Sequence, residues 1–149
     1  MTQAYTNRFT EVHQPGGVLV PDSYAVGLYP TGYTSMANRQ RAVLLLGVGE
    51  MQAASTVDCQ LWQATSAAGA NAKIVAGKAI TQLTQAGGDG DDLVAIELRT
   101  EELDVDGGFS FVQAVVTVGG DASELSVVLL LGCTNYAPVP TTAWTEIVD

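Results

Sequence analysis

Apolar and polar residues alternate along most of this chain, and the alternation predicts β-strands. Residues 56–64 show it most clearly, because apolar Val57, Cys59 and Leu61 are separated by polar side chains. The run at 42–48 is apolar throughout, and we expect both of its faces to be buried. The same criteria predict further strands at 24–29, 93–98, 109–118 and 125–131.

Turns rich in glycine and aspartate separate these strands, and no long segment has the 3.6-residue period of a helix. The turns lie at 87–92, 104–108 and 119–121, and 66–71 is a turn or a short helix start. Residues 73–83 fit either a strand or a short helix, and 100–103 fit one helical turn. Many short strands with such turns are typical of sandwiches and barrels. We therefore predict an all-β fold, an antiparallel β-sandwich of jelly-roll-like type.

The string Val-Leu-Leu-Leu-Gly occurs twice, at 43–47 and at 128–132. The repeat hints that two central strands pair with each other. The apolar composition common to buried strands explains it more economically. In the final strand we expect Leu130 to lie in the core.

The length of 149 residues favours one domain. Near the N-terminus, Pro15–Gly17 and Pro21 are expected to break any regular element. The C-terminal stretch is rich in proline and carries isolated aromatic residues. We divide the chain into an extended N-terminal arm (1–22), a β-sandwich domain (23–134) and a C-terminal tail (135–149).

Composition and charge exclude several classes of protein. Hydrophobic residues make up 47% and charged residues 15%, which does not fit disorder. Six Lys and Arg stand against 16 Asp and Glu, a net charge of −10, and only Arg39 and Arg41 lie close in sequence. Binding to phosphates or to anionic lipids requires clustered cations. We predict no nucleic-acid partner and no membrane partner.

The N-terminal residues have no apolar stretch of the kind found in secretory signals. We therefore expect Cys59 and Cys133 to be reduced, buried and inert thiols in a cytosolic setting. Their spacing does not match a zinc site.

Catalytic chemistry has few candidates. His13 is the one histidine in the sequence and lies on the predicted arm, where a catalytic triad would not be rigid. Nucleotide-binding and zinc-protease motifs are absent from the sequence. We predict that the protein is not an enzyme, has no catalytic residues and needs no cofactor.

Half of the acidic residues lie between Asp89 and Asp106. Calcium favours such loops, but an EF-hand loop starting at Asp89 would need Gly at its sixth position and Glu at its twelfth, where Val94 and Thr100 stand. The stretch fits a solvated acidic edge, or a patch for a basic partner, better than a metal site.

A sugar-binding site is a weaker possibility. Tyr24, Tyr29 and Tyr33, beside Trp62, would have to line a groove, while core and interface roles are commoner for such residues.

Four segments resemble the decoration (cement) or minor capsid proteins of tailed bacteriophages: Gln63–Gly69, Lys73–Lys78, Glu102–Phe109 and Val112–Gly120. They are strand-and-turn patterns rather than catalytic signatures. The resemblance implies a β-sandwich or jelly roll that forms homodimers or homotrimers. It also implies binding to the major capsid protein on the outer surface of the virion, after assembly in the bacterial cytoplasm.

The resemblance predicts that the chain cements neighbouring capsid subunits. Two alternatives stay open: a structural protein of the tail or head–tail connector, and a carbohydrate-binding β-sandwich module. The residues that we expect at a protein interface lie on the arm, on the acidic loop and on the tail: Phe9, Val12, Asp89, Asp91, Asp92, Tyr136 and Trp144.

Overall fold

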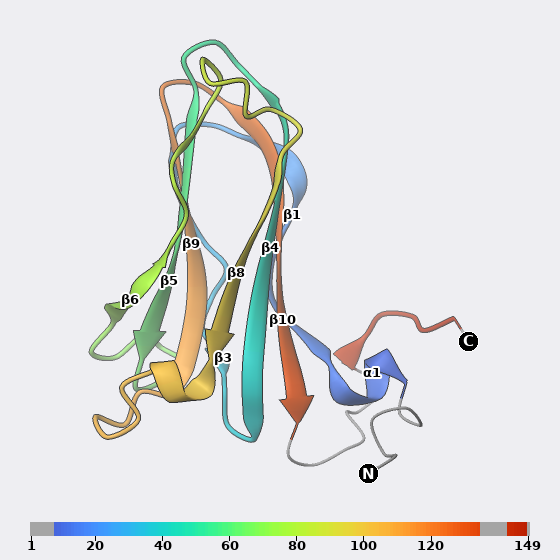
Figure 1. Ribbon diagram of the computed structural model, residues 1–149, viewed down its shortest axis with the longest axis vertical. Helices are drawn as coiled ribbons and strands as arrows, with labels where there is room; N and C mark the ends of the chain where they lie inside the picture. Colours follow the sequence, from blue (N-terminus) through green and yellow to red (C-terminus); the bar gives the residue numbers. More distant parts are fainter. Residues whose placement is uncertain (1–7, 135–142, 149) are drawn as a thin grey trace.

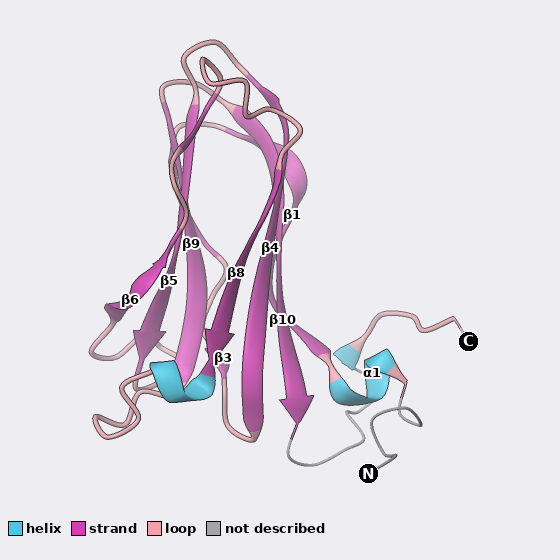
Figure 2. Cartoon of the chain, viewed as in Figure 1, coloured by secondary structure: helices cyan, strands magenta, loops and turns pink. Residues whose placement is uncertain are grey.

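The computed structural model describes residues 8–134 and 143–148, which form two antiparallel sheets packed face to face (Figures 1 and 2). Sheet A has the strand order β1 (Gln14–Tyr24), β10 (Ser123–Thr134), β4 (Arg39–Met51) and β8 (Leu93–Arg99). Sheet B has the order β2 (Gly27–Pro30), β9 (Phe111–Gly119), β5 (Thr56–Ala64) and β6 (Lys73–Ala79). The short strands β3 (Thr34–Ser35) and β7 (Leu83–Thr84) pair with β9 and β5. The described residues also form two single helical turns, α1 (Phe9–Val12) and the 3-10 turn η2 (Thr100–Glu102).

Strands near the two ends of the sequence pair with each other, and each further pair lies closer to the middle of the chain. The first strand pairs with the last (β1 with β10), β2 and β3 pair with β9, β4 pairs with β8, and β5 pairs with β6. The contacts of β10 with β4 and of β9 with β5 then join these pairs into two sheets. This nested order is that of a jelly roll. The predicted all-β sandwich is confirmed, and its jelly-roll type follows from the strand order.

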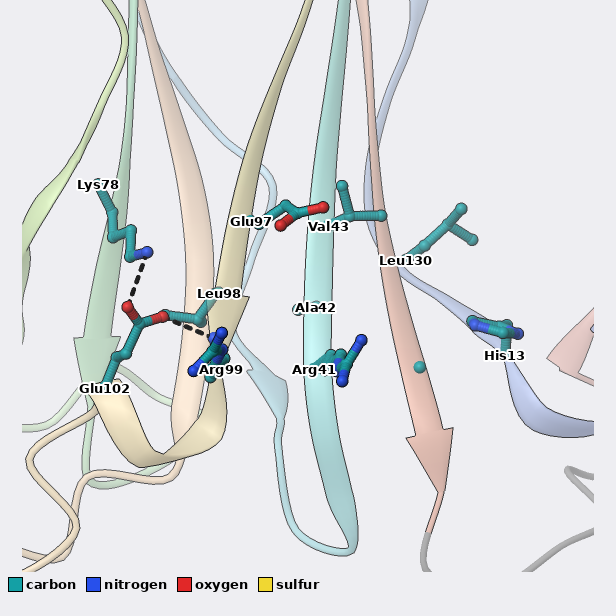
Figure 3. A pocket seen from close by; sticks show the side chains of 11 residues that line it. His13, Arg41, Ala42, Val43, Lys78, Glu97, Leu98, Arg99, Glu102 and Leu130 are labelled. Atoms are coloured by element: carbon teal, nitrogen blue, oxygen red, sulfur yellow. Dashed lines mark hydrogen bonds and ion pairs between the residues drawn. The ribbon is translucent and has the colours of Figure 1, made fainter. Parts of the chain in front are cut away.

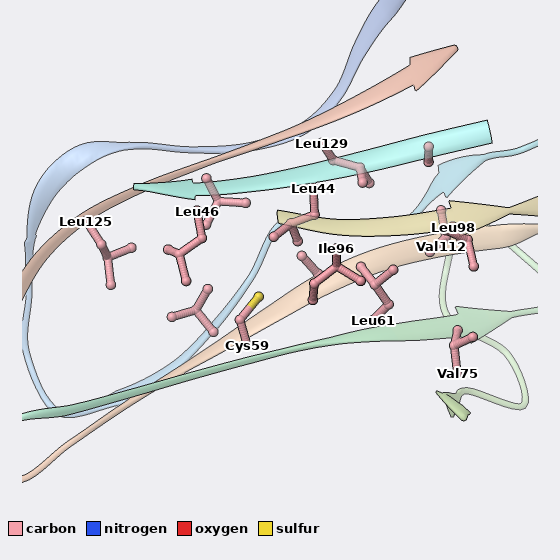
Figure 4. Packing of buried hydrophobic residues seen from close by; sticks show 14 of the residues in the cluster. Leu44, Leu46, Cys59, Leu61, Val75, Ile96, Leu98, Val112, Leu125 and Leu129 are labelled. Atoms are coloured by element: carbon pink, nitrogen blue, oxygen red, sulfur yellow. The ribbon is translucent and has the colours of Figure 1, made fainter. Parts of the chain in front are cut away.

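The core lies between the two sheets and is built from alternate residues of their strands (Figure 4). Leu44 and Leu46 of β4 and Leu129 of β10 meet Leu61 of β5 and Val116 of β9, and each of these side chains is fully buried. Large side chains without exposed surface on both sheets supply the apolar burial that holds the two layers together.

The two Val-Leu-Leu-Leu-Gly segments are paired at the centre of sheet A. Leu44 lies opposite Leu129, and Val43 lies opposite Leu130. The pairing at which the repeat hinted is therefore present, although shared composition was the simpler explanation.

Three expectations about these central strands and the N-terminal segment are wrong. Residues 42–48 bury only one face, because Ala42, Leu44, Leu46 and Val48 point inward while the residues between them are partly exposed. Leu130 is also on the outward side.

The N-terminal segment is not free of regular structure, because residues 14–24 form β1 at the edge of sheet A. Its register shifts between Pro15 and Val18 and again between Leu19 and Asp22. These irregularities accommodate the prolines and glycines, since an edge strand and a bulge tolerate a missing N–H group.

The strand expected at 24–29 is not continuous, because β1 ends at Tyr24 in sheet A and β2 begins at Gly27 in sheet B. Most other local predictions agree with the structure. Residues 73–79 are strand rather than helix, 56–64 match β5 at both ends, and 100–102 form the single helical turn. The 87–92 stretch is a loop. In the turn between β9 and β10, Gly120 has φ +72°, and a Cβ there would lie 1.9 Å from the Ala54 carbonyl oxygen. Glycine is required at this position by both its backbone conformation and its close neighbour.

We expect Leu129→Ala to lower the free energy of unfolding by about 2–5 kcal/mol, because it leaves a cavity in the centre of the core. The neighbouring change Leu130→Ala removes an outward side chain and should cost clearly less. Urea denaturation of both variants measures the difference. Equal midpoints for the two variants would contradict the inward and outward assignment in β10.

Candidate protein-interaction surface

The outer face of sheet A is apolar, although it points away from the core. One row of directly opposed residues crosses all four strands and consists of Val18, Val128, Leu45 and Ala95. Val18 and Ala95 are exposed and the other two are partly exposed. The neighbouring rows add further outward apolar side chains: Val43, Leu130 and Leu93. Antiparallel sheets with one solvated face normally carry polar residues there.

Sheet B mixes polar and apolar residues on its outer face, where Leu28 and Ile74 are 68% and 53% exposed. Asp58 lies opposite Thr117 and Trp62 opposite Gln113 in its two central strands. Gln60 is paired with Val115 between them. Each outward row of sheet B contains a polar residue, whereas one row of sheet A is apolar across all four strands, as in the centre of an interface.

One end of this face carries arginines. Arg41 of β4 and Arg99 of β8 are direct cross-strand partners. Both are exposed, and together with His13, Glu97 and other residues they line a depression of about 560 Å³ (Figure 3). Sequence spacing predicted that the cations are scattered, but the β4–β8 pairing brings these two together.

Arg41 and Arg99 differ in their partners. Arg99 forms an ion pair of 3.5 Å with Glu101, in which both side chains are highly exposed, so the pair contributes little. Arg41 has no ion pair with any residue that the structure describes. Like charges directly opposite each other destabilise a sheet, so this end of the face favours an acidic partner.

The other end of the same face is acidic. Glu124 lies over Gly49, whose Cβ position would be 3.3 Å from the Glu124 carboxylate. Glu50 and Asp91 line one depression with Glu124, and Asp22 lines another with it. Neither depression has a lysine or arginine among its lining residues. The face therefore has a basic end, an apolar centre and an acidic end.

The predicted interface residues of the arm and tail lie together at one end of the molecule. Arg8, Thr10 and Glu11 line a depression with Trp144, so the segment around α1 and the C-terminal segment are side by side (Figure 1). Phe9 and Val12 belong to the same helical turn. Tyr136 lies outside the described residues.

Phe9 is held by a local stack. The residue is 56% exposed, and its ring stacks on the His13 ring at 4.1 Å between centroids. The His13 Nδ1 atom is 3.1 Å from the Phe9 carbonyl oxygen, and the ring lies over Gly132 of β10. His13 thus fastens α1 against the end of sheet A.

The acidic loop lies at the opposite end of the long axis from α1 (Figure 1). Asp89 accepts a hydrogen bond from the Thr84 backbone N–H at 2.8 Å. Asp91 has a positive φ of 63°, and Asp92 accepts the Val48 N–H through its backbone carbonyl. Asp89 shapes the loop, whereas the Asp91 and Asp92 side chains are exposed. The structure therefore divides the predicted interface residues between two distant ends.

Two further acidic residues of this stretch act in local structure. Asp104 accepts hydrogen bonds from Lys73 Nζ at 2.6 Å and from the Gly107 N–H at 3.0 Å, which lower the pKa of its carboxyl group. Glu102 accepts from the Arg99 N–H, the larger cause, and from Lys78, and its pKa is lowered as well. Among the described residues, no three His, Cys, Asp or Glu side chains are grouped so as to hold a metal ion.

Two of the tyrosines considered for a sugar groove have structural roles. Tyr24 and Tyr29 pack edge to face at 4.8 Å, and their hydroxyl groups donate to the carbonyl oxygens of Val20 and Ala25. Both rings also pack against the core cluster. Tyr33 contacts the turn at Gly69 instead. These contacts use the rings within the fold.

The apolar outer face was missed in the sequence, although the signal was present. Arg39 and Arg41 share the parity of Val43 and Leu45, and Glu124 and Ser126 share that of Val128. Because successive side chains of a strand alternate between faces, these polar residues indicate which apolar residues point outward.

A similarity to a known protein was found in the structure but not in the sequence. No protein-family model matches this chain, and no curated protein sequence matches it. A chain of the cryo-EM structure of Broad Bean Stain Virus aligns with a TM-score of 0.40 and 10% identity, over 97% of this chain and 96% of that chain. The jelly-roll assignment rests on the strand order and not on this similarity. Among the described residues, no helix is long and apolar enough to cross a membrane.

Cys59 is a free thiol in the core, at 2% exposure. Burial, and to a smaller extent the Asp58 carboxylate, raise the pKa of its thiol to about 12. In a Cys133→Ser variant we expect a disulfide reagent such as DTNB to leave the folded protein unlabelled at pH 8, because the thiolate is the reactive form. Labelling should reach one thiol per chain only in denaturant. Rapid labelling of the folded variant would contradict the burial of Cys59.

Proposed function

We propose that this chain is a structural virion protein, a decoration protein that binds the outer surface of a phage capsid and cements neighbouring major capsid subunits. The observation that carries the proposal is the exposure of apolar side chains on separate parts of the fold, among them Phe9 on α1 and Leu28 on β2, which suits contact with protein rather than water. The resemblance of the strand-and-turn segments to decoration proteins supports the more specific role.

The distribution of exposed apolar residues also supports a protein with several contact surfaces. Val20, Val26 and Leu28 are 63%, 60% and 68% exposed and belong to the β1–β2 edge, whereas Phe9 lies on α1. A cement protein must touch at least two subunits, and separate apolar surfaces suit that role. The acidic surface suits contact with a basic capsid protein.

Imaging of the phage particle with which the chain is produced tests the role. We expect cryo-EM density for the jelly roll at regular positions over the outside of the capsid. Density confined to the tail or portal would replace the proposal by a tail or connector role. Absence of the chain from purified particles would contradict a virion function and favour the carbohydrate-binding alternative.

The contribution of α1 can be measured with a matched pair of variants. Phe9→Ser removes a ring that is 56% exposed, and Val105→Ser removes a side chain that is 58% exposed in the turn after η2. We expect Phe9→Ser to weaken co-sedimentation with capsids lacking the chain by about 10-fold, as for an aromatic interface residue. Val105→Ser should leave it unchanged.

A deletion of residues 1–12 extends the same test, since it keeps β1 intact, whereas a deletion to residue 20 would remove most of that strand. Unchanged capsid binding of both Phe9→Ser and the deletion would remove α1 from the interface.

A further inference from the structure

We propose that the outer face of sheet A binds a second copy of this chain, so that two sheets pack face to face around a two-fold axis. The inference rests on the proposed structural role and specifies the partner of this surface. The four strands have 11, 12, 13 and 7 residues. At about 16 Å² of sheet per residue (3.3 Å rise by 4.8 Å spacing), the face measures about 700 Å². A standard interface takes about 800 Å² from each partner.

The charges along β4 select one orientation of the second copy. Leu45 lies in the central apolar row, and Arg41 and Gly49 are each four residues away from it in opposite directions. Glu124 covers Gly49. A two-fold axis perpendicular to the strands and through this row therefore places Arg41 of one copy opposite Glu124 of the other.

The neighbouring strand β8 repeats the arrangement. Ala95 lies in the central row, Arg99 follows it by four residues, and Asp91 precedes it by four. The same axis places Arg99 of one copy opposite Asp91 of the other. Glu97, the acidic side chain nearest the centre, meets the exposed Leu93 of the second copy rather than another acid. An axis parallel to the strands would instead place the basic end of one copy on the basic end of the other, and the acidic end on the acidic end.

The antiparallel arrangement offsets the repulsion between like charges at each end of the face, which the isolated chain leaves uncompensated. Arg41 and Arg99 are like charges directly opposite each other, and Glu50, Asp91 and Glu124 line one depression whose lining has no cation. Each end is the complement of the other, which is the condition for an isologous two-fold interface. Two sheets packed in this way also match the aligned geometry of β-sandwiches.

The α1 segment flanks the basic end without covering its arginines. His13 lies over Gly132 on the β10 side, whereas the Arg99 side chain on the far strand is 71% exposed, and Arg41 is exposed as well (Figure 3). The depression between His13 and these arginines is where the Glu124 carboxylate of the second copy would enter.

Sedimentation equilibrium of the purified full chain tests the proposal. We expect the parent to have twice its monomer mass of 15.5 kDa. Leu45→Glu buries an unpaired charge at the centre of the interface and should raise the dimer dissociation constant by about 100-fold or more. Val115→Glu makes a matched change on the outer face of sheet B and should leave the dimer intact. Circular dichroism checks that both variants fold.

Charge reversal tests the orientation without disturbing the apolar centre. Arg41→Glu and Glu124→Arg should each weaken the dimer by about 10-fold, because each places like charges in contact. The double variant keeps the net charge of the parent and should restore the parent dissociation constant. Failure of the double variant to recover would overturn the antiparallel arrangement.

Two results would overturn the proposal. One is a parent chain that is monomeric at about 100 μM. The other is a dimer that Val115→Glu or Phe9→Ser dissociates while Leu45→Glu leaves it intact. These results are separate from the particle imaging, which tests the capsid role. Decoration of capsids by a chain that stays monomeric would retain the proposed function and reject the dimer.

Discussion

The rest of the structure depends on the insertion of the last strand, β10, between β1 and β4. This strand joins the first element of the sequence to its middle, and the nested pairs of the jelly roll can form only when it is in place. Its inward residues Val127, Leu129 and Leu131 are fully buried beneath sheet B. Because side chains alternate strictly along a strand, a shift of one residue would exchange this inner set for Val128 and Leu130. Register in this one strand therefore determines both the core and the outer surface.

The same constraint connects the fold to the proposed function. The central parts of β4 and β10 carry apolar residues on both sides. One face of sheet A therefore packs in the core, and a second apolar face stays outside. Such a surface is a liability in an isolated chain, because it promotes unspecific association. Glu124 at one end and Arg41 at the other restrict what can bind, since only a partner with the reverse order of charges fits both.

The structure places the predicted interface residues in different settings, and the reasons can be identified. Phe9 and Trp144 lie in neighbouring segments at one end of the molecule, and Asp91 and Asp92 lie on an exposed loop at the other, but their roles at an interface stay predictions. The charge of Asp89 predicts an interface residue, yet its carboxylate accepts a hydrogen bond from the Thr84 N–H and closes the loop. Sequence cannot distinguish a solvated carboxylate from one that caps a turn, because both occur in the same Gly- and Asp-rich stretches.

The sequence by itself determined the class of fold, the position of most strands and the inward face of β5, because local alternation and turn residues act over a few positions. It did not determine that β1 would form across Pro15 and Pro21, because only the neighbouring β10 supplies the partner for that edge strand. Nor did it bring Arg41 beside Arg99, which are joined by the pairing of β4 with β8. Those features depend on contacts between residues far apart in the chain. The tertiary structure alone decided which side of an all-apolar run became the core and which became a surface.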